Sequence, residues 1–198
     1  LFRSLIGRFG AELLGKANYA RFGQEFPLLV KFIDAREDLS IQVHPDDELA
    51  RKRHGKSGKC EMWYVLEAEP GASLLTGFSR PIAPAEYERR VADNTLTDVL
   101  NRQAIASGDV FYLPAGRVHS IGKGSFIVEI QQSSDITYRI YDFDRRDAAG
   151  NSRELHTELA REAIDFESSE NSRITYAPEN NQEVRLVTTP YFTRSEER

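Results

Sequence analysis

The stretch Gly108-Asp-Val-Phe-Tyr-Leu-Pro-Ala-Gly-Arg-Val-His119 decides the fold. It combines a glycine, a tight Pro-x-Gly turn and a histidine at the spacing of the metal-binding strand pair of a small β-barrel. The turn would bring His119 back over the mouth of such a barrel. Earlier in the chain stand His44, on a predicted strand, and Glu61, between the two segments. Two histidines and one carboxylate on strands form a candidate open metal site, which indicates chemistry rather than binding alone.

The flanking strands supply the geometry for that site. Leu39–His44 alternates with period two, so Ser40, Gln42 and His44 share one face and Gln42 stands beside the proposed ligand His44. A single strand histidine is better explained as a hydrogen-bonded, half-buried residue than as a metal ligand. The set of His44, Glu61 and His119, with the spacing of the second segment, favours a metal instead.

Three cations stand at positions where a charge is unexpected. Lys31 interrupts an apolar strand, Lys59 comes two residues before Glu61, and Arg139 lies inside a strand-like run. Burying a cation is costly unless it has a partner. One explanation is snorkelling or a salt bridge with Asp34, Glu129, Asp135 or Asp142. The other is that the cations share the face of the metal and bind an anionic ligand, such as a phosphate or an enediolate.

The remaining pattern predicts a mainly β fold with few helices, either a barrel or a sandwich. Helices are expected at 4–22, 84–102 and 152–166, and a short one from Pro45 to Gly55, with strands between them at short spacing. Three parts are expected along the chain. They are a helical lead-in at 1–25, a barrel core with the metal site at 26–145, and a helix plus tail with a candidate strand at 146–198.

Composition narrows the class of protein. The 198 residues carry a net charge of −5, which argues against a nucleic-acid partner. Cys60 is the only cysteine, so an internal disulfide and a cysteine-rich zinc site are both excluded. No apolar run approaches the roughly 18 residues of a membrane span, and no signal peptide is recognised. We therefore expect a cytoplasmic protein without a membrane partner. Because Leu1 is not an initiator methionine, the chain is expected to begin inside a longer one.

The chain resembles the type I mannose-6-phosphate isomerases, which are zinc-dependent members of the cupin superfamily. Gly108–His119 matches the second cupin motif. Gln42 stands where many cupins have a first histidine, and Glu61 comes later than usual, which is what the isomerase branch shows. The resemblance covers roughly residues 20–165. Four further segments carry it: Phe26–Ala35, Leu39–Asp47, Gly58–Val65 and Ser134–Asp142.

The resemblance implies a cupin (jelly-roll-like) β-barrel with a few peripheral helices. It implies one zinc ion per chain and a sugar-phosphate substrate, with mannose 6-phosphate and fructose 6-phosphate interconverted through an enediol(ate). The family chain usually runs further at both ends. The residue roles that it implies are His44, Glu61 and His119 as metal ligands with Gln42 as a fourth, Arg139 and Lys59 in catalysis, and Lys31 and Ser40 in binding the substrate.

Some alternatives stay open at this point. The base could be a lysine whose pKa is lowered by desolvation, or a zinc-bound water. Two histidines and a carboxylate also describe a non-haem iron oxygenase on the same barrel, although that reading leaves the three cations without a role. A third reading is a non-catalytic, metal-containing sugar-binding cupin. The sequence gives no prediction of the oligomeric state.

Overall fold

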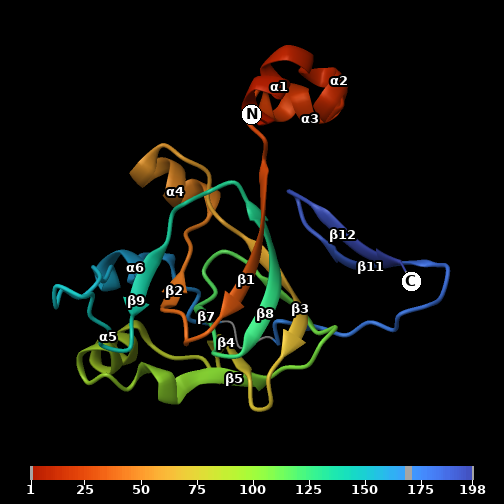
Figure 1. Ribbon diagram of the computed structural model, residues 1–198. Coiled ribbons are helices and arrows are strands. Elements are labelled where there is room, and N and C mark those ends of the chain that lie inside the picture. Colours follow the sequence, from red (N-terminus) through yellow and green to blue (C-terminus); the bar gives the residue numbers. More distant parts are fainter. Residues whose placement is uncertain (1, 168–170, 198) are drawn as a thin grey trace.

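In the computed structural model, residues 2–167 and 171–197 are described, and strands dominate them (Figure 1). They form two five-stranded antiparallel sheets and a separate hairpin. The first sheet has the order β1 (Leu28–Ala35), β8 (Ser125–Gln132), β3 (Glu61–Ala68), β6 (Val110–Leu113) and β10 (Arg173–Ile174). The second has the order β5 (Leu100–Ala104), β4 (Ser73–Phe78), β7 (His119–Ile121), β2 (Ile41–Val43) and β9 (Tyr138–Tyr141). The hairpin pairs β11 (Glu183–Thr188) with β12 (Thr193–Glu197).

Helices lie around these sheets. Three short ones form a cluster that stands apart from the strands and joins them through β1 (Figure 1). None of the helices in the described ranges has the length and apolar character to cross a bilayer. The helices are α1 (Phe2–Phe9), α2 (Ala11–Leu14), α3 (Lys16–Phe22), α4 (Asp47–His54), α5 (Pro84–Ala92), the 3-10 helix η1 (Leu96–Val99) and α6 (Thr157–Ala163).

The two five-stranded sheets pack face to face. Trp63 and Phe111 from the first sheet share an apolar cluster with Leu74 and Ile121 from the second. Alternation along β3 explains the arrangement, because Glu61, Trp63 and Val65 leave one face of the strand while the residues between them leave the other. The same inner face therefore carries both the apolar core and, at the start of β3, a buried carboxylate.

Each outer face is covered by a different element. On the second sheet, Ile41, Val43 and Ile140 pack with Tyr87 of α5 and Ala160 of α6. On the first sheet, the outward residues include Met62 and Val110, and these pack with Leu186 and Val187 of β11 and with Phe192. Both faces of both sheets are thus apolar over much of their area. Polar side chains buried between the sheets are therefore exceptions, and their burial calls for a structural or functional explanation.

The mainly β class with a few peripheral helices is confirmed, but the sheets are not closed into a barrel. β1 and β10 are the edge strands of the first sheet, and β5 and β9 are those of the second. Side-chain packing, rather than a continuous ladder of hydrogen bonds, holds the two sheets together. The division of the chain at 25 and 145 stays a prediction.

Some predicted elements differ from the structure. The helix expected at 84–102 ends at Ala92, Asn94 has a left-handed backbone (φ 54°), and Leu100–Ala104 forms β5. Leu96, Val99 and Leu100 face the core, so burial there outweighs helical continuity. The helix expected at 4–22 is divided at Gly10 and Gly15, and the one at 152–166 is shortened to α6.

The connection from α4 to β3 is tightly packed at Gly58. The N-terminal cap of α4 is Asp46, whose carboxylate accepts a hydrogen bond from Leu49 N–H at 2.8 Å. The Gly58 N–H donates to Asp47 Oδ1 at 2.8 Å. A Cβ atom at Gly58 would lie 2.3 Å from the carbonyl carbon of Asp46. The segment that leads from His44 to Glu61 is therefore fixed by backbone-to-backbone contact.

We predict that Gly58→Ala lowers the free energy of unfolding by about 1–3 kcal/mol, the usual cost of overpacking a closed site. Urea unfolding followed by circular dichroism measures it. Gly7→Ala is the matched control, since a Cβ there meets nothing within 4 Å and the position is helical. Equal stability of the two variants would contradict the packing described for Gly58.

Candidate functional site

Three potential metal ligands converge between the two sheets. His44 directly follows β2, His119 begins β7 and Glu61 begins β3. The two histidines come from the second sheet and Glu61 comes from the first, so the three side chains meet between the sheets. We refer to His44, Glu61 and His119 as the metal group. One ligand atom from each lies within 4.8 Å of the others. Their exposed fractions are 2 % for His44, 0 % for Glu61 and 1 % for His119.

Backbone carbonyls fix the orientation of both imidazoles. His44 Nδ1 lies 2.9 Å from Ile136 O, and His119 Nδ1 lies 2.7 Å from Arg117 O. Each Nδ1 is therefore assigned the N–H, which leaves the lone pair on Nε2. The Nε2 atoms lie 3.4 Å (His44) and 3.3 Å (His119) from the two oxygens of Glu61. An outer carbonyl that sets the tautomer of an inner imidazole is typical of metal-binding histidines.

Three polar atoms at the centre of this group lack hydrogen bonds among the described residues. His44 Nε2 and both oxygens of Glu61 are buried without a hydrogen-bond partner among the described residues. Lys59 Nζ lies 2.9 Å from Glu61 Oε2, an ion pair whose angles do not make a hydrogen bond. Leaving such atoms unsatisfied costs about 1–3 kcal/mol each, and more for a charged group. A divalent cation would satisfy all three, so these residues fit a metal ion.

The protonation states also suit a cation. Burial lowers the pKa of His44 to about 4 and lowers the pKa of His119 as well, so both imidazoles are neutral near pH 7. For Glu61, burial raises the pKa, but His119, His44 and Lys59 around it hold the pKa well below its usual range. Neutral imidazole and ionised carboxylate are the forms that bind metal. The three ligands together carry one negative charge.

Gln42 lies on β2, which leads to His44, and Ser40 directly precedes that strand. Gln42 Nε2 is 3.2 Å from His119 Nε2, so the amide of Gln42 borders the group directly. The side-chain oxygen and nitrogen of Gln42 would have to exchange places for it to act as a ligand. Ser40 is buried, and its place on the face of Gln42 and His44 stays a prediction.

Arg139 occupies the same row of the second sheet. The register pairs Thr76 with His119, His119 with Gln42, and Gln42 with Arg139, so these side chains share one face. The guanidinium Nη1 of Arg139 donates to Glu154 O at 3.0 Å, while its Nε is buried without a hydrogen bond among the described residues. Arg139 is thus in the row of the metal group, with its outer nitrogen anchored on the segment before α6.

Lys31 reaches the group through a second buried carboxylate. Its Nζ lies 2.7 Å from Oε1 of Glu129, and Lys59 Nζ lies 4.0 Å from the same oxygen. The sequence pattern indicated Glu129 only as a salt-bridge partner of a cation, whereas in the structure it lies between two of the predicted site lysines. Trp63 also borders the site, because its Nε1 donates to Glu129 Oε2 at 3.1 Å and its ring meets His119 edge-on. An acid inside the apolar run of β8 is the signal that could have identified Glu129.

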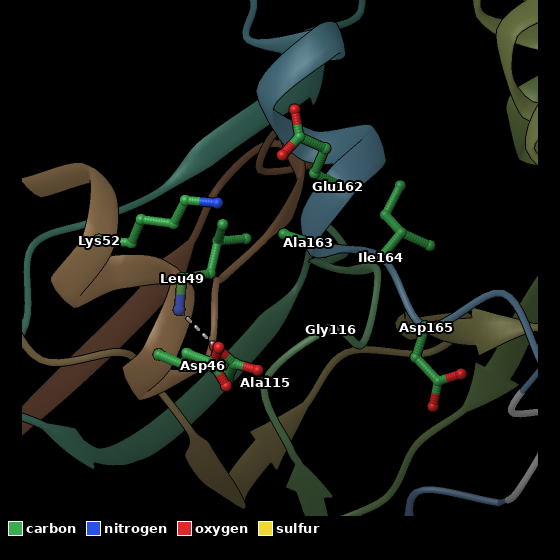
Figure 2. Close-up of a pocket in the computed structure, with 10 residues that line it drawn as sticks. Asp46, Leu49, Lys52, Ala115, Gly116, Glu162, Ala163, Ile164 and Asp165 are labelled. Atoms are coloured by element: carbon green, nitrogen blue, oxygen red, sulfur yellow. Dashed lines mark hydrogen bonds between the residues drawn. The ribbon is translucent and has the colours of Figure 1, made fainter.

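A separate pocket of about 320 Å³ lies between α4 and the end of α6 (Figure 2). The predicted site residues are not among those that line it. In Figure 2, the carboxylates of Glu162 and Asp165 point in different directions rather than to one centre. Four of the ten lining residues are acidic (Asp46, Glu48, Glu162 and Asp165), and Lys52 is basic. The converging chemistry is therefore in the metal group and not in this pocket.

Comparisons with known proteins agree with this geometry. A family model for the catalytic domain of type I phosphomannose isomerase matches residues 5–78. The chain is 40 % identical over 169 residues to a mannose-6-phosphate isomerase of Streptococcus mutans, covering 85 % of this chain and 53 % of that protein. It is 43 % identical over 147 residues to the mannose-6-phosphate isomerase ManA of Bacillus subtilis, covering 74 % of this chain and 46 % of that protein. The chain spans about half the length of these curated relatives.

A solved structure is also similar. The crystal structure of the mannose 6-phosphate isomerase from Bacillus subtilis matches with a TM-score of 0.83 and 33 % identity, covering 95 % of this chain and 59 % of that one. The resemblance expected from the sequence is confirmed. These matches make the chain similar to the type I phosphomannose isomerases over most of its length.

Proposed function

We propose that this chain carries the catalytic site of a zinc-dependent aldose–ketose isomerase that interconverts mannose 6-phosphate and fructose 6-phosphate. The observation that carries the proposal is the buried group of His44, Glu61 and His119, in which His44 Nε2 and both Glu61 oxygens lack a hydrogen bond among the described residues. The relatives named mannose-6-phosphate isomerase supply the substrate. Because the chain spans about half of those relatives, the activity of these 198 residues is itself part of the proposal.

Zinc is the proposed metal, held by His44, Glu61 and His119 with Gln42 as a fourth ligand. Two imidazoles with one carboxylate form a donor set that zinc enzymes use. A bound zinc ion would polarise the substrate carbonyl and lower the cost of the developing negative charge on oxygen. An iron oxygenase would use the same donors, but the lysines beside this group support an anionic substrate instead.

The neighbouring cations are proposed to handle the two anionic parts of the substrate. Lys31 and Ser40 would bind the phosphate and so orient the sugar through a part that does not react. Arg139 would stabilise the enediolate as fixed positive charge on the face that it shares with Gln42 and His119. Lys59, in contact with Glu61, would carry the proton between C2 and C1. The cytoplasm is the proposed location, as expected for a sugar-phosphate enzyme with a single cysteine.

We predict that the purified chain interconverts mannose 6-phosphate and fructose 6-phosphate, that a chelator abolishes the activity, and that zinc restores it. A coupled assay for fructose 6-phosphate measures the rate, and elemental analysis measures the metal. Iron in place of zinc, together with oxygen consumption, would support the oxygenase instead. Stabilisation against heat by mannose 6-phosphate without turnover would support a non-catalytic sugar-binding protein.

We predict that Glu61→Gln weakens zinc binding by more than about 100-fold, since losing even an outer partner of a metal ligand costs roughly 10- to 100-fold. Glu67→Gln is the matched control, because Glu67 lies on the same strand and is exposed. Competition with a zinc-sensitive dye measures the affinity. Full zinc occupancy in Glu61→Gln would show that Glu61 is not a ligand.

We predict that Arg139→Ala lowers kcat by about 100- to 1,000-fold, the range for removing one group that stabilises an oxyanion. Its zinc content should stay at one ion per chain. Arg102→Ala on β5, at the opposite edge of the same sheet, is the matched control and should keep its kcat. If Arg139→Ala instead loses zinc in proportion to its rate, the residue acts on the metal site and not on the reaction.

A further inference from the structure

The ammonium group of Lys31 is held by two neighbouring acceptors on β8. Lys31 Nζ donates to Glu129 Oε1 at 2.7 Å and to Gln131 Oε1 at 2.5 Å. Glu129 and Gln131 are two residues apart on the strand, so both point to the inner face, and Lys31 lies directly opposite Glu129 in the register of β1 and β8. We refer to Glu129 and Gln131 as the acceptor pair.

Each member of the acceptor pair is itself fixed. The second oxygen of Glu129 accepts from the Trp63 indole N–H at 3.1 Å, and Trp63 is fully buried. The Gln131 amide nitrogen donates to Gln132 O at 2.8 Å and to Ser134 O at 2.9 Å. Because those two carbonyls hold the amide nitrogen, the orientation of the amide is fixed and Gln131 Oε1 points toward Lys31. Neither acceptor can therefore turn away without breaking another hydrogen bond.

The acceptor pair leaves part of Lys31 available. An ammonium has three N–H donors, and among the described residues the acceptor pair uses two of them. The side chain of Lys31 is 40 % exposed, whereas that of Glu129 is 5 % exposed. A third donor is thus directed by buried partners but can be reached from solvent.

The same residues border the metal group. Gln131 and Glu61 are paired in the register of β8 and β3, and so are Glu129 and Trp63. Lys59, which contacts Glu61, lies 4.0 Å from Glu129. No net charge results from the two ammonium groups and two carboxylates of Lys31, Lys59, Glu61 and Glu129. A divalent cation would therefore give this array a charge of about +2. That charge matches a phosphate, which carries about −1.5 to −2.

We propose that Glu129 and Gln131 are positioning residues, which aim the third N–H of Lys31 at the phosphate of the substrate. The inference rests on the proposed function, because it takes a sugar phosphate as the ligand. A carboxylate so close to a phosphate site repels the substrate. Its presence is explained if a preorganised lysine contributes more than that repulsion removes.

The charge of Glu129 makes the test decisive, because a positioning role and a purely repulsive role predict opposite changes in kcat/KM. In Glu129→Gln the side chain keeps its shape and its acceptor for Trp63 but loses its charge. If Glu129 positions Lys31, kcat/KM for mannose 6-phosphate falls roughly 10- to 100-fold, as for a displaced binding group. If Glu129 is only a negative charge near the phosphate, KM falls and kcat/KM rises. Glu67→Gln, exposed on β3, is the matched control and should leave both constants unchanged.

A double-mutant cycle tests whether Glu129 acts through Lys31. In the Lys31→Met background, Glu129→Gln should change kcat/KM by less than about 2-fold, because contacting residues couple. Losses that simply multiply would overturn the positioning role. Should Glu129→Gln fail to fold, Gln131→Met takes its place in the same cycle, since it removes one acceptor without removing a charge.

A readout without turnover separates this inference from the proposed function. We expect the ammonium ¹H–¹⁵N signal of Lys31 to be observable by NMR in the wild-type chain and lost in Glu129→Gln. A wild-type chain that shows this signal but does not isomerise would overturn the proposed function and the substrate named here, while the ordering of Lys31 would stand. An active wild-type chain with unchanged kcat/KM in Glu129→Gln would overturn the positioning role.

Discussion

The meeting of Glu61 with two imidazoles across the gap between the sheets is the constraint on which the site depends. Glu61 comes from the first sheet, and His44 and His119 come from the second. Packing between the sheets therefore sets the distances of 3.3 and 3.4 Å from the carboxylate to the histidines. The apolar cluster around Trp63 lies on the same inner face and holds that spacing. Stability and site geometry are in this way properties of one interface.

Around that group, the inner face changes from apolar to charged over a few residues. Trp63 marks the boundary, because its ring belongs to the core while its N–H donates to Glu129. Charges buried without partners are expensive, and here the two lysines and two carboxylates offset one another. The proposed function gives a reason for retaining them, since a hydrophobic lining would serve packing equally well but would offer no charge to an anionic substrate.

Much of the fold and of the candidate site could be predicted from the sequence, and the features that could not be predicted depend on contacts between distant segments. Alternation along Leu39–His44 placed Gln42 beside His44, because a strand has a fixed period of two. The helix predicted at 84–102 ends at Ala92 in the structure, because burial of Leu96 and Leu100 beyond it outweighs their helical propensity. The sequence also did not show that the sheets stay open rather than closing into a barrel. Pairing between edge strands depends on long-range contacts, which leave no local pattern in the sequence. The role of Glu129 was missed since a strand pattern shows which residues share a face but not which atoms meet across it.

Trp63 gives this architecture a practical consequence. It is the only tryptophan of the chain, it is fully buried, and it touches both His119 and Glu129. Excitation at long ultraviolet wavelengths therefore yields emission from a single indole beside the group of His44, Glu61 and His119. Loading of the cation or occupation by a sugar would alter the local field at that indole, so the natural fluorescence of the protein serves as a label-free optical probe of the site.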